Sequence, residues 1–460
     1  MLEISEMKKL FEEITSGIYS NDWKITAEVL SEGKVRQEIP KVEYLITNSD
    51  YTAQVASYLT LGVLVGPVFY KTHITPYKDN LQIQLTISPR TSQAGDIETL
   101  PKVVKVYDAY PNNNVDVDLD AGFSTSDLTT AESGQLLNVS FQLIEPILNE
   151  MRMASVNGVY KYTTVSNLLR GLLSYGLEGN TDTESLKEFN YPGVRGVDII
   201  PATNQKSYDT ILIPAVSEQG EMKLTKLTKF IQQEYGVYGT GCGSYFDRGW
   251  WFIYPLFELH RFNQVSQKLT IIILDEDEAT GLEQTYKRDG DHITILATGK
   301  TSNLDNSERV AANMGDAVRL NRASDLNEGG IEISNNKATG IGTQTTRQAT
   351  IESRKSGLQN VSYAKDVFTD NPYKELSRIA ALKGMRLVVN WQRGNPAFLK
   401  PSIPVRVLYG KNNQLATKYG VLHGFEDKFM TASGNYADDN FAHYLKLVLF
   451  VDKSTEEAEE

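Results

Sequence analysis

Residues 385–451 constrain the fold of this chain more than any other stretch. They contain four runs rich in Val, Leu, Tyr and Phe, at residues 385–392, 403–409, 418–429 and 441–451. Gly, Asn, Ser and Pro residues lie between the runs. Short apolar runs separated by such turn formers are typical of strands in hairpins and meanders. The sequence therefore predicts that this part of the chain folds as a small antiparallel sheet or barrel.

A helix is predicted directly before this sheet, at residues 371–383. Asn371 is a good N-cap, and Pro372 suits the first helical turn because its missing N–H is not needed there. Gly384 follows the last helical residue and is expected to end the helix in the left-handed conformation.

The first third of the chain also reads as mainly strand. Residues 81–87, Leu-Gln-Ile-Gln-Leu-Thr-Ile, alternate apolar and polar side chains, which is typical of a half-buried strand. Further strands are predicted at residues 23–30, 41–46, 102–107 and 136–144. Residues 7–18 have the spacing of an amphipathic helix, residues 55–70 form a bent strand pair or a buried connector, and residues 108–134 form a long loop.

The middle of the chain mixes helices and strands. Helices are predicted at 162–175, with Thr163 or Thr164 as the cap, and at 223–235, followed by a hairpin at 238–258. Two β-branched strands are expected at 268–274 and 292–297. Residues 298–361 are rich in Asn, Ser, Thr and Gly; we predict a helix at 305–320 and an extended segment that orders on a partner.

These elements predict a mainly β fold with some helix, in the α+β class. We expect a first β-barrel module with an N-terminal helix at 1–145 and a mixed helix and hairpin domain at 146–265. A second β-barrel module with the polar insertion 298–361 follows at 266–454, and residues 455–460 form a solvated acidic tail. The strands suggest a loose duplication of one β-rich module. The first copy lies at residues 20–145, and the second is made from residues 268–300 and 385–451.

Composition limits the possible functions. The formal net charge of −12 disfavours tight non-specific binding to DNA phosphates. The single cysteine, Cys242, excludes an internal disulfide and a cysteine-rich zinc site. The first residues lack a secretory signal pattern, and the apolar run at 58–70 is too short to cross a bilayer. We expect a protein of the cytoplasm, or of a particle assembled there.

Several residue groups are candidate sites, and two of them are loops. Asp116, Asp118 and Asp120 alternate as in a calcium loop, but the glycine falls one position late, so a solvated loop explains them better. Residues 299–301, Gly-Lys-Thr, resemble the end of a phosphate-binding loop, but its first glycine would be Thr294, inside a strand.

The glycine-rich stretch 239–243 reads as a tight turn. It follows a helix and precedes a hairpin, whereas a dinucleotide site needs a strand, a turn and a helix. Within it, Cys242 would be a nucleophile only with a histidine beside it, and His260 is the nearest in sequence. A buried thiol is the simpler interpretation.

The remaining candidates also have structural explanations. The acidic run 275–278 is expected to be a hydrated strand end. The other histidines, His73, His292, His423 and His443, lack metal-ligand spacing. Trp250 and Trp251 should point to opposite faces of a strand, one into a core and one to an interface or the surface. We therefore expect no catalytic, cofactor-binding or metal-binding residues.

Three stretches together match a known pattern. They are the strand-to-helix transition at 139–175, the helix, hairpin and aromatic strand at 223–257, and the final module, with Asn-Pro-Ala-Phe-Leu-Lys-Pro at 395–401 and Tyr-Gly-Val-Leu-His-Gly-Phe at 419–425. They resemble the baseplate hub of contractile-tailed bacteriophages, a family related to the hub part of type VI secretion spikes. Ser402 departs from the glycine usual in the family, and the segment 298–361 makes this chain longer.

The resemblance implies a structural, non-enzymatic virion protein of the tail baseplate, synthesised in the host cytoplasm. It implies a homotrimeric ring whose six β-barrel modules join the sixfold tail tube to the threefold central spike, with baseplate wedge or adaptor proteins as further partners. No membrane anchor is implied. The negative charge suits a lumen through which DNA slides without binding stably, and cyclic symmetry is the ordinary route to such rings.

Three alternatives remain open. The chain could be another tail or neck adaptor. It could be a virion-associated hydrolase of cell wall or polysaccharide, with Asp275 and Glu278 as candidate carboxylates. It could also bind host glycans through Trp250, Trp251 and Tyr245.

Overall fold

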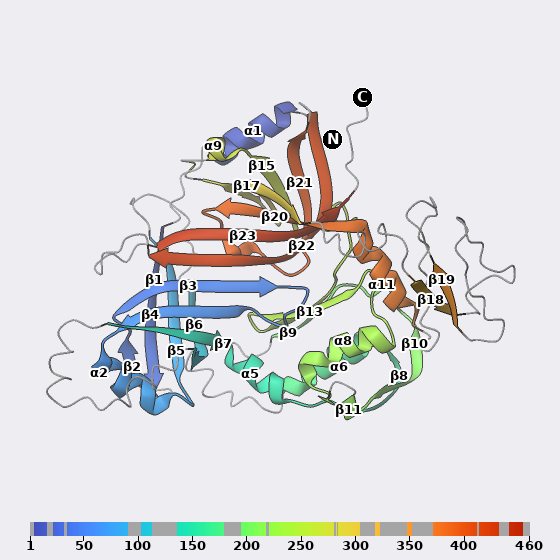
Figure 1. Ribbon diagram of the computed structural model, residues 1–460, viewed down its shortest axis with the longest axis horizontal. Coiled ribbons are helices and arrows are strands. Elements are labelled where there is room, and N and C mark those ends of the chain that lie inside the picture. The colour runs from blue at the N-terminus through green and yellow to red at the C-terminus, as the bar shows by residue number, and fades with distance from the viewer. Residues whose placement is uncertain are drawn as a thin grey trace.

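The first half of the fold is a set of antiparallel strands (Figure 1). The computed structural model describes residues 4–15, 22–31, 35–90, 103–112, 136–178, 195–217, 220–279, 282, 284–303, 318–322, 347–351, 371–411, 414–431 and 441–453. The strands of the first half are β1 (Asp22–Ser31), β2 (Val35–Glu38), β3 (Lys41–Asp50), β4 (Tyr58–Val65), β5 (Gln82–Arg90), β6 (Val103–Pro111) and β7 (Leu137–Ile144). Between β4 and β5 the chain forms the short helical turns α2 (Pro67–Phe69), η1 (Tyr70–Ile74) and η2 (Thr75–Tyr77). The apolar run at 55–70 is thus one strand followed by helical turns.

The middle part packs helices beside short strands. Its helices are α5 (Pro146–Met153), α6 (Val165–Glu178) and α8 (Leu224–Glu234). Its strands are β8 (Gly158–Thr164), β9 (Gly196–Ile199), β10 (Ser207–Ile213), β11 (Val216–Ser217), β12 (Gly220–Glu221), β13 (Cys242–Asp247) and β14 (Trp250–Pro255). The predicted cap is confirmed at Thr164, whose Oγ1 accepts from the backbone N–H of Asn167 at 3.3 Å. The predicted hairpin is β13 paired with β14.

The last part contains the longest strands. Its elements are β15 (Lys268–Leu274), α9 (Glu276–Ala279), β16 (Tyr286–Asp289), β17 (His292–Asn303), β18 (Val318–Arg322), β19 (Arg347–Ile351), α11 (Pro372–Lys383), β20 (Gly384–Gln392), η4 (Pro396–Phe398), β21 (Pro404–Lys411), β22 (Gln414–Thr431) and β23 (Phe441–Asp452). The four C-terminal strands and the helix before them are confirmed.

Two local expectations in this part are wrong. Gly384 does not end α11 in the left-handed conformation: it has φ −108° and ψ 179°, and it is the first residue of β20. The predicted helix at 305–320 fails at its C-terminal end, because residues from Val318 onward pair with β19 as strand β18. Most of 298–361, the loop 113–134 and the tail 455–460 lie outside the described residues.

One large mixed sheet of 14 strands takes the place of two separate antiparallel barrels. The reason is the length of β22 and β23. Strand β22 pairs with β21 through its first half and with β3 through its second half, while β23 follows β22 along most of its length. The sheet is mixed because β15 runs parallel to both β17 and β21.

The sheet nevertheless encloses two apolar cores. One lies among β1, β3, β4, β5, β6 and β7 and includes Trp23, Leu61 and Phe141. The second lies among β15, β17, β20, β21, β22 and β23 and includes Trp391, Ile271 and Leu447. A third core, around α5, α6, α8 and Trp251, belongs to the middle part.

Helix α1 (Ile4–Thr15) packs on the last part of the chain. Ile14 is fully buried and lies in a small cluster with Ile272, Leu296 and Leu408. Glu13 also forms an ion pair with Lys287 at 2.6 Å. In Figure 1 the helix accordingly lies beside β15, far from β1.

Candidate functional site

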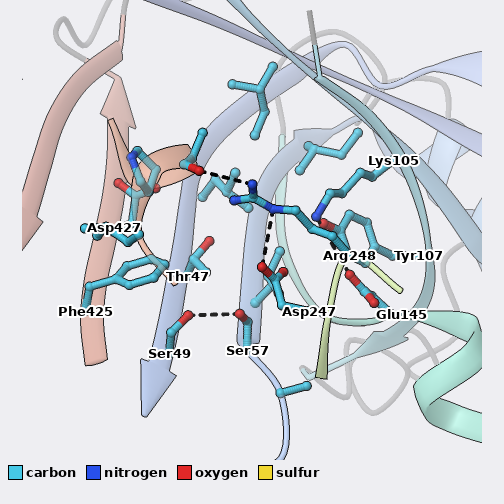
Figure 2. A pocket seen from close by; sticks show the side chains of 18 of the residues that line it. Thr47, Ser49, Ser57, Lys105, Tyr107, Glu145, Asp247, Arg248, Phe425 and Asp427 are labelled. Carbon is cyan, nitrogen blue, oxygen red and sulfur yellow. Dashed lines mark hydrogen bonds and ion pairs between the residues drawn. The ribbon is translucent and has the colours of Figure 1, made fainter. Parts of the chain in front are cut away.

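A cavity of about 270 Å³ lies where the three parts of the chain meet. Strands of the first half form one wall, through residues such as Leu45, Thr47 and Lys105. The turn of the β13–β14 hairpin supplies Asp247 and Arg248, and the segment around η4 supplies Ala397. Figure 2 shows the Arg248 side chain extending between these walls.

Three carboxylates line the cavity, and each lies against a basic side chain. Lys105 Nζ lies 3.7 Å from Glu145 Oε1, and Arg248 Nε lies 3.3 Å from Asp247 Oδ2. These two pairs come from different walls (Figure 2). The third, from His443 Nε2 to Asp427 Oδ1, measures 2.5 Å, and both side chains are 5% exposed or less. Each of these carboxylates therefore has a basic side chain of the protein as its partner.

The pKa values of Lys105 and Tyr107 depend on burial and on the charged groups beside them. Burial opposes its charge, but the nearby Tyr107, Glu145 and Asp247 more than offset this and raise the pKa of Lys105 above its ordinary value. Burial also raises the pKa of Tyr107, although Lys105 works against that rise. Lys105 is therefore protonated and Tyr107 neutral at neutral pH, which suits a fixed contact.

Arg248 links two elements across the cavity. It occupies the turn between β13 and β14 with a φ of 52°, in the left-handed region that a tight hairpin turn requires. Its Nη1 donates to the backbone oxygen of Ala397 at 3.1 Å. The Asp-Arg-Gly turn at 247–249 thereby joins the middle part to the segment that precedes β21.

A chain of hydroxyl groups connects the same parts from the other side. Ser49 and Ser57 lie 2.9 Å apart, and Ser57 lies 2.9 Å from the Tyr245 hydroxyl. Tyr254 donates to the backbone oxygen of Tyr51 at 2.6 Å. These bonds, two partly buried and one buried, attach the β3–β4 connection to the hairpin.

The geometry provides no complete hydrolytic centre among the described residues. A Ser-His-Asp mechanism needs the second histidine nitrogen on a nucleophile. Here Nδ1 of His443 has no hydrogen-bond partner in the part of the chain that the structure describes. The imidazole is stacked on Phe429, with ring centroids 4.4 Å apart, and lies edge-on to Trp23. The pair is enclosed by aromatic rings, which fits a packing role.

The glycine-rich candidates have ordinary structural roles. Gly299 has a φ of 71° at a register shift inside β17, and the strand continues after it to Asn303, so no strand-to-helix phosphate loop is built at Gly299. Cys242 begins β13, and burial raises the pKa of its thiol above the ordinary range. Its Sγ lies 3.7 Å from the oxygen of Gly243, and the thiol form predominates at neutral pH.

The charged candidates are not brought together. The run 275–278 is exposed at the end of β15 and in α9, and none of its residues lines the cavity. Asp116, Asp118 and Asp120 lie outside the described residues. Across the described ranges, no group of three or more His, Cys, Asp or Glu residues is placed to hold a metal ion.

The histidines are dispersed. His260 is exposed, and the ring of His73 lies 5.0 Å from that of Phe69. His423 lies near Leu256, and His292 lies near Thr270. Only His443 is next to the cavity, through its ion pair with Asp427.

The tryptophan prediction is confirmed, and it argues against glycan binding at this place. Trp251 is fully buried, whereas Trp250 is 37% exposed. Tyr245 is only 1% exposed. Because two of the three aromatic rings proposed to stack on a sugar are inside the protein, they do not form a sugar-binding surface.

Sequence reasoning missed the cavity residues. Lys105, Glu145, Asp247, Arg248 and Asp427 are far apart in the chain and form no recognisable spacing. The one local signal was the Asp-Arg-Gly turn at 247–249, which marks the tip of the hairpin.

No helix in the described ranges is long and apolar enough to cross a membrane.

Comparisons with known proteins give distant structural likenesses only. No protein-family model matches the sequence, and no curated protein matches it. A Francisella PdpA–VgrG complex has a chain that is 11% identical with a TM-score of 0.37; the match covers 99% of this chain but only 57% of the other. The 43 kDa tail protein of prophage MuSo2 from Shewanella oneidensis is 12% identical with a TM-score of 0.44, covering 94% and 98% of the two chains.

A third likeness is to an Escherichia coli component of the type VI secretion system, described as similar to the T4 bacteriophage tail proteins gp27 and gp5. It is 8% identical with a TM-score of 0.37, and the match covers 89% of this chain and 73% of the other. The three neighbours are thus a PdpA–VgrG complex, a prophage tail protein and a component of the type VI secretion system.

Proposed function

We propose that this chain is a structural component of a phage tail baseplate, and more narrowly a subunit of its trimeric hub. The observation that carries the proposal is the presence of two β modules with separate cores, joined by strands that run through both. One core is built around Trp23 and Phe141, the other around Trp391 and Leu447. Strand β22 contributes Phe429 to the first core and Leu422 to the second.

This organisation supports the assembly that the resemblance implies. With two modules in each chain, three chains present six modules around one axis, which suits a sixfold tail tube on one side and a threefold central spike on the other. Joining the modules through continuous strands holds them in a fixed relation, which a ring that transmits force requires. Wedge or adaptor proteins and the passing DNA would meet the outer and inner surfaces.

The cavity supports a mechanical role over an enzymatic one. Its three carboxylates lie against Lys105, Arg248 and His443, and its hydroxyl groups bond one another. A glycosidase needs two carboxyl groups facing a substrate across an open cleft. The parts of the chain are instead connected by the bond from Arg248 to the Ala397 oxygen and by the bonds of Tyr245 with Ser57 and of Tyr254 with the Tyr51 oxygen, as in a rigid joint.

Oligomeric state and shape test the proposal. Light scattering on the purified protein is expected to give three times the chain mass of 51.4 kDa, and electron-microscopy class averages are expected to show a threefold ring. A protein that stays monomeric and globular across micromolar to high concentrations would contradict it. Dye release from purified peptidoglycan separates the hydrolase alternative: the hub proposal expects no turnover.

A further inference from the structure

A second polar feature lies on the outer face of β15, β17 and β21. Leu269, Ile293 and Val405 face the second core. Since side chains alternate along a strand, Lys268, His292 and Arg406 belong to the opposite face. The register places Lys268 beside His292, and Arg406 beside Thr270. Three basic side chains from three neighbouring strands therefore share one small area.

The three basic groups surround a single aromatic ring. Arg406 Cζ lies 4.9 Å and Lys268 Nζ 5.2 Å from the ring centroid of Phe262, and the His292 ring lies 6.1 Å away. Within the described ranges, neither Lys268 nor Arg406 forms an ion pair, and the buried Nε of Arg406 lacks a hydrogen-bond acceptor. We call Lys268, His292 and Arg406 the basic cluster. It is a concentration of cationic charge on a protein whose net charge is −12.

Hydrogen bonds connect Arg406, Thr270 and His292. Arg406 Nη2 donates to Thr270 Oγ1 at 3.3 Å, and the same oxygen lies 2.8 Å from His292 Nε2. The Thr270 hydroxyl has two lone pairs and one proton, so while it accepts from Arg406 it can either donate to His292 Nε2 or accept from it, depending on the tautomer.

The pKa of His292 lies below its ordinary value. It is lowered by burial first, then by the charges of Lys268 and Arg406, while Asp289 opposes the change. Nearby carboxylates would stabilise Lys268 and Arg406, and they would raise the pKa of His292.

The last described strand, β23, ends on the same outer face of the sheet as the basic cluster. Gly420 of β22 faces Val451 of β23, so the next residues, Tyr419 and Asp452, are neighbours. Tyr419 in turn faces Arg406 of β21. Asp452 therefore lies two strand spacings, about 10 Å, from Arg406. Because Val451 points into the second core, Asp452 belongs to the outer face that carries the basic cluster.

The sequence beyond this strand has complementary charge. Residues 454–460 read Ser-Thr-Glu-Glu-Ala-Glu-Glu, with four carboxylates in seven residues. Fully extended, seven residues span up to about 23 Å, more than twice the separation from Arg406. We propose that the basic cluster is a carboxylate-binding site and that its occupant is the acidic segment 454–460 of the same chain.

Proteolysis of the full-length protein tests this contact. A glutamate-specific protease cleaves after Glu456 and Glu457 only when the segment is released. At about 10 mM salt, loss of the segment, followed by intact mass, is expected to be roughly threefold or more faster in Lys268→Gln/Arg406→Gln than in wild type. At about 0.5 M salt the two rates should converge, because the attraction is screened.

The control removes the same charge elsewhere. Arg152→Gln/Lys161→Gln changes two exposed cations in the middle part and should leave the cleavage rate at the wild-type value. Equal rates in wild type and the cluster variant at low salt would overturn the proposal. If the double variant unfolds, Lys268→Gln alone serves, because within the described ranges Lys268 packs over the Phe262 ring and forms no side-chain hydrogen bond or ion pair.

A second readout reports on the site itself. Changing Glu456, Glu457, Glu459 and Glu460 to Gln is expected to lower the pKa of His292, measured by NMR, because carboxylates near the ring favour its protonated form. In the Lys268→Gln/Arg406→Gln background the same four changes should have no effect on His292. An unchanged His292 titration in both backgrounds would show that the segment binds elsewhere.

Discussion

At the scale of single residues, His423 is a buried group whose ionisation opposes folding. Its Nε2–H donates to the backbone oxygen of Leu256 at 2.9 Å, and its ring stacks on Phe450 with centroids 5.1 Å apart. Burial is the main cause that lowers its pKa to about 4, while the hydrogen bond to Leu256 acts in the other direction. Between about pH 6.5 and pH 4 the unfolded chain therefore binds a proton that the folded chain does not, so stability falls as pH falls.

This gives a prediction for His423→Gln, whose amide can still donate to Leu256. The wild type should lose up to about 3 kcal/mol of unfolding free energy from this one residue between pH 6.5 and pH 4. The variant should lose less over the same interval, although it is less stable at pH 7 because the stacked ring is absent. Urea unfolding at several pH values measures both slopes, and parallel curves would refute the assignment.

At the scale of elements, one side chain joins two helices. Asn371 Oδ1 accepts from the backbone N–H of Tyr373 at 3.0 Å, which caps the start of α11. Its Nδ2 donates to the backbone oxygens of Gln232 and Gln233 at 2.8 Å and 2.7 Å, at the end of α8. The residue is 7% exposed, so water does not readily replace these bonds.

Asn371→Ala is therefore expected to cost about 2–3 kcal/mol, the loss of a cap plus two poorly satisfied carbonyl groups. Asn371→Asp keeps the cap acceptor but places a carboxylate beside the carbonyl groups, so it should also destabilise. Chemical denaturation measures the difference in unfolding free energy. Asn48→Ala, at an exposed position of β3, is the matched control and should stay within about 0.5 kcal/mol of wild type.

At the scale of the whole molecule, strand β22 sets the position of the two modules relative to each other. Its register with β23 shifts between Leu422 and Gly424, where the strand passes from its partner β21 to its partner β3. At Gly424, a Cβ would lie 2.1 Å from the backbone oxygen of Ser49 in β3. Only glycine allows this close approach, so the joint between the modules depends on it.

Gly424→Ala should accordingly destabilise both modules together, by about 3 kcal/mol or more, because backbone atoms of β3 must move. Thermal unfolding, followed by the fluorescence of Trp23 in one core and Trp391 in the other, should show one transition at a lower temperature. Gly410→Ala in β21, where a Cβ meets nothing within 4 Å, should leave the transition almost unchanged. A variant in which only one module melts early would show that the modules fold independently.

Much of the local structure was readable from the residues themselves. Alternation in 81–87, the apolar runs of the last four strands and the Asn371-Pro372 start of α11 are local signals, because strand and helix periods follow from backbone geometry. The same holds for the placement of Trp250 and Trp251 on opposite faces of a strand. Gly384 and the helix expected at 305–320 failed because pairing with a neighbouring strand outweighed local preference.

The sequence alone thus determined a mainly β chain with a helical middle part, since each element is specified by side chains close together in sequence. Only the tertiary structure decided that β22 and β23 pass through both halves, that α1 packs on β15, β17 and β21, and that Lys105, Asp247 and Asp427 meet around one cavity. Those contacts join residues hundreds of positions apart. They depend on strand register and on buried surface, neither of which has a local pattern in the chain.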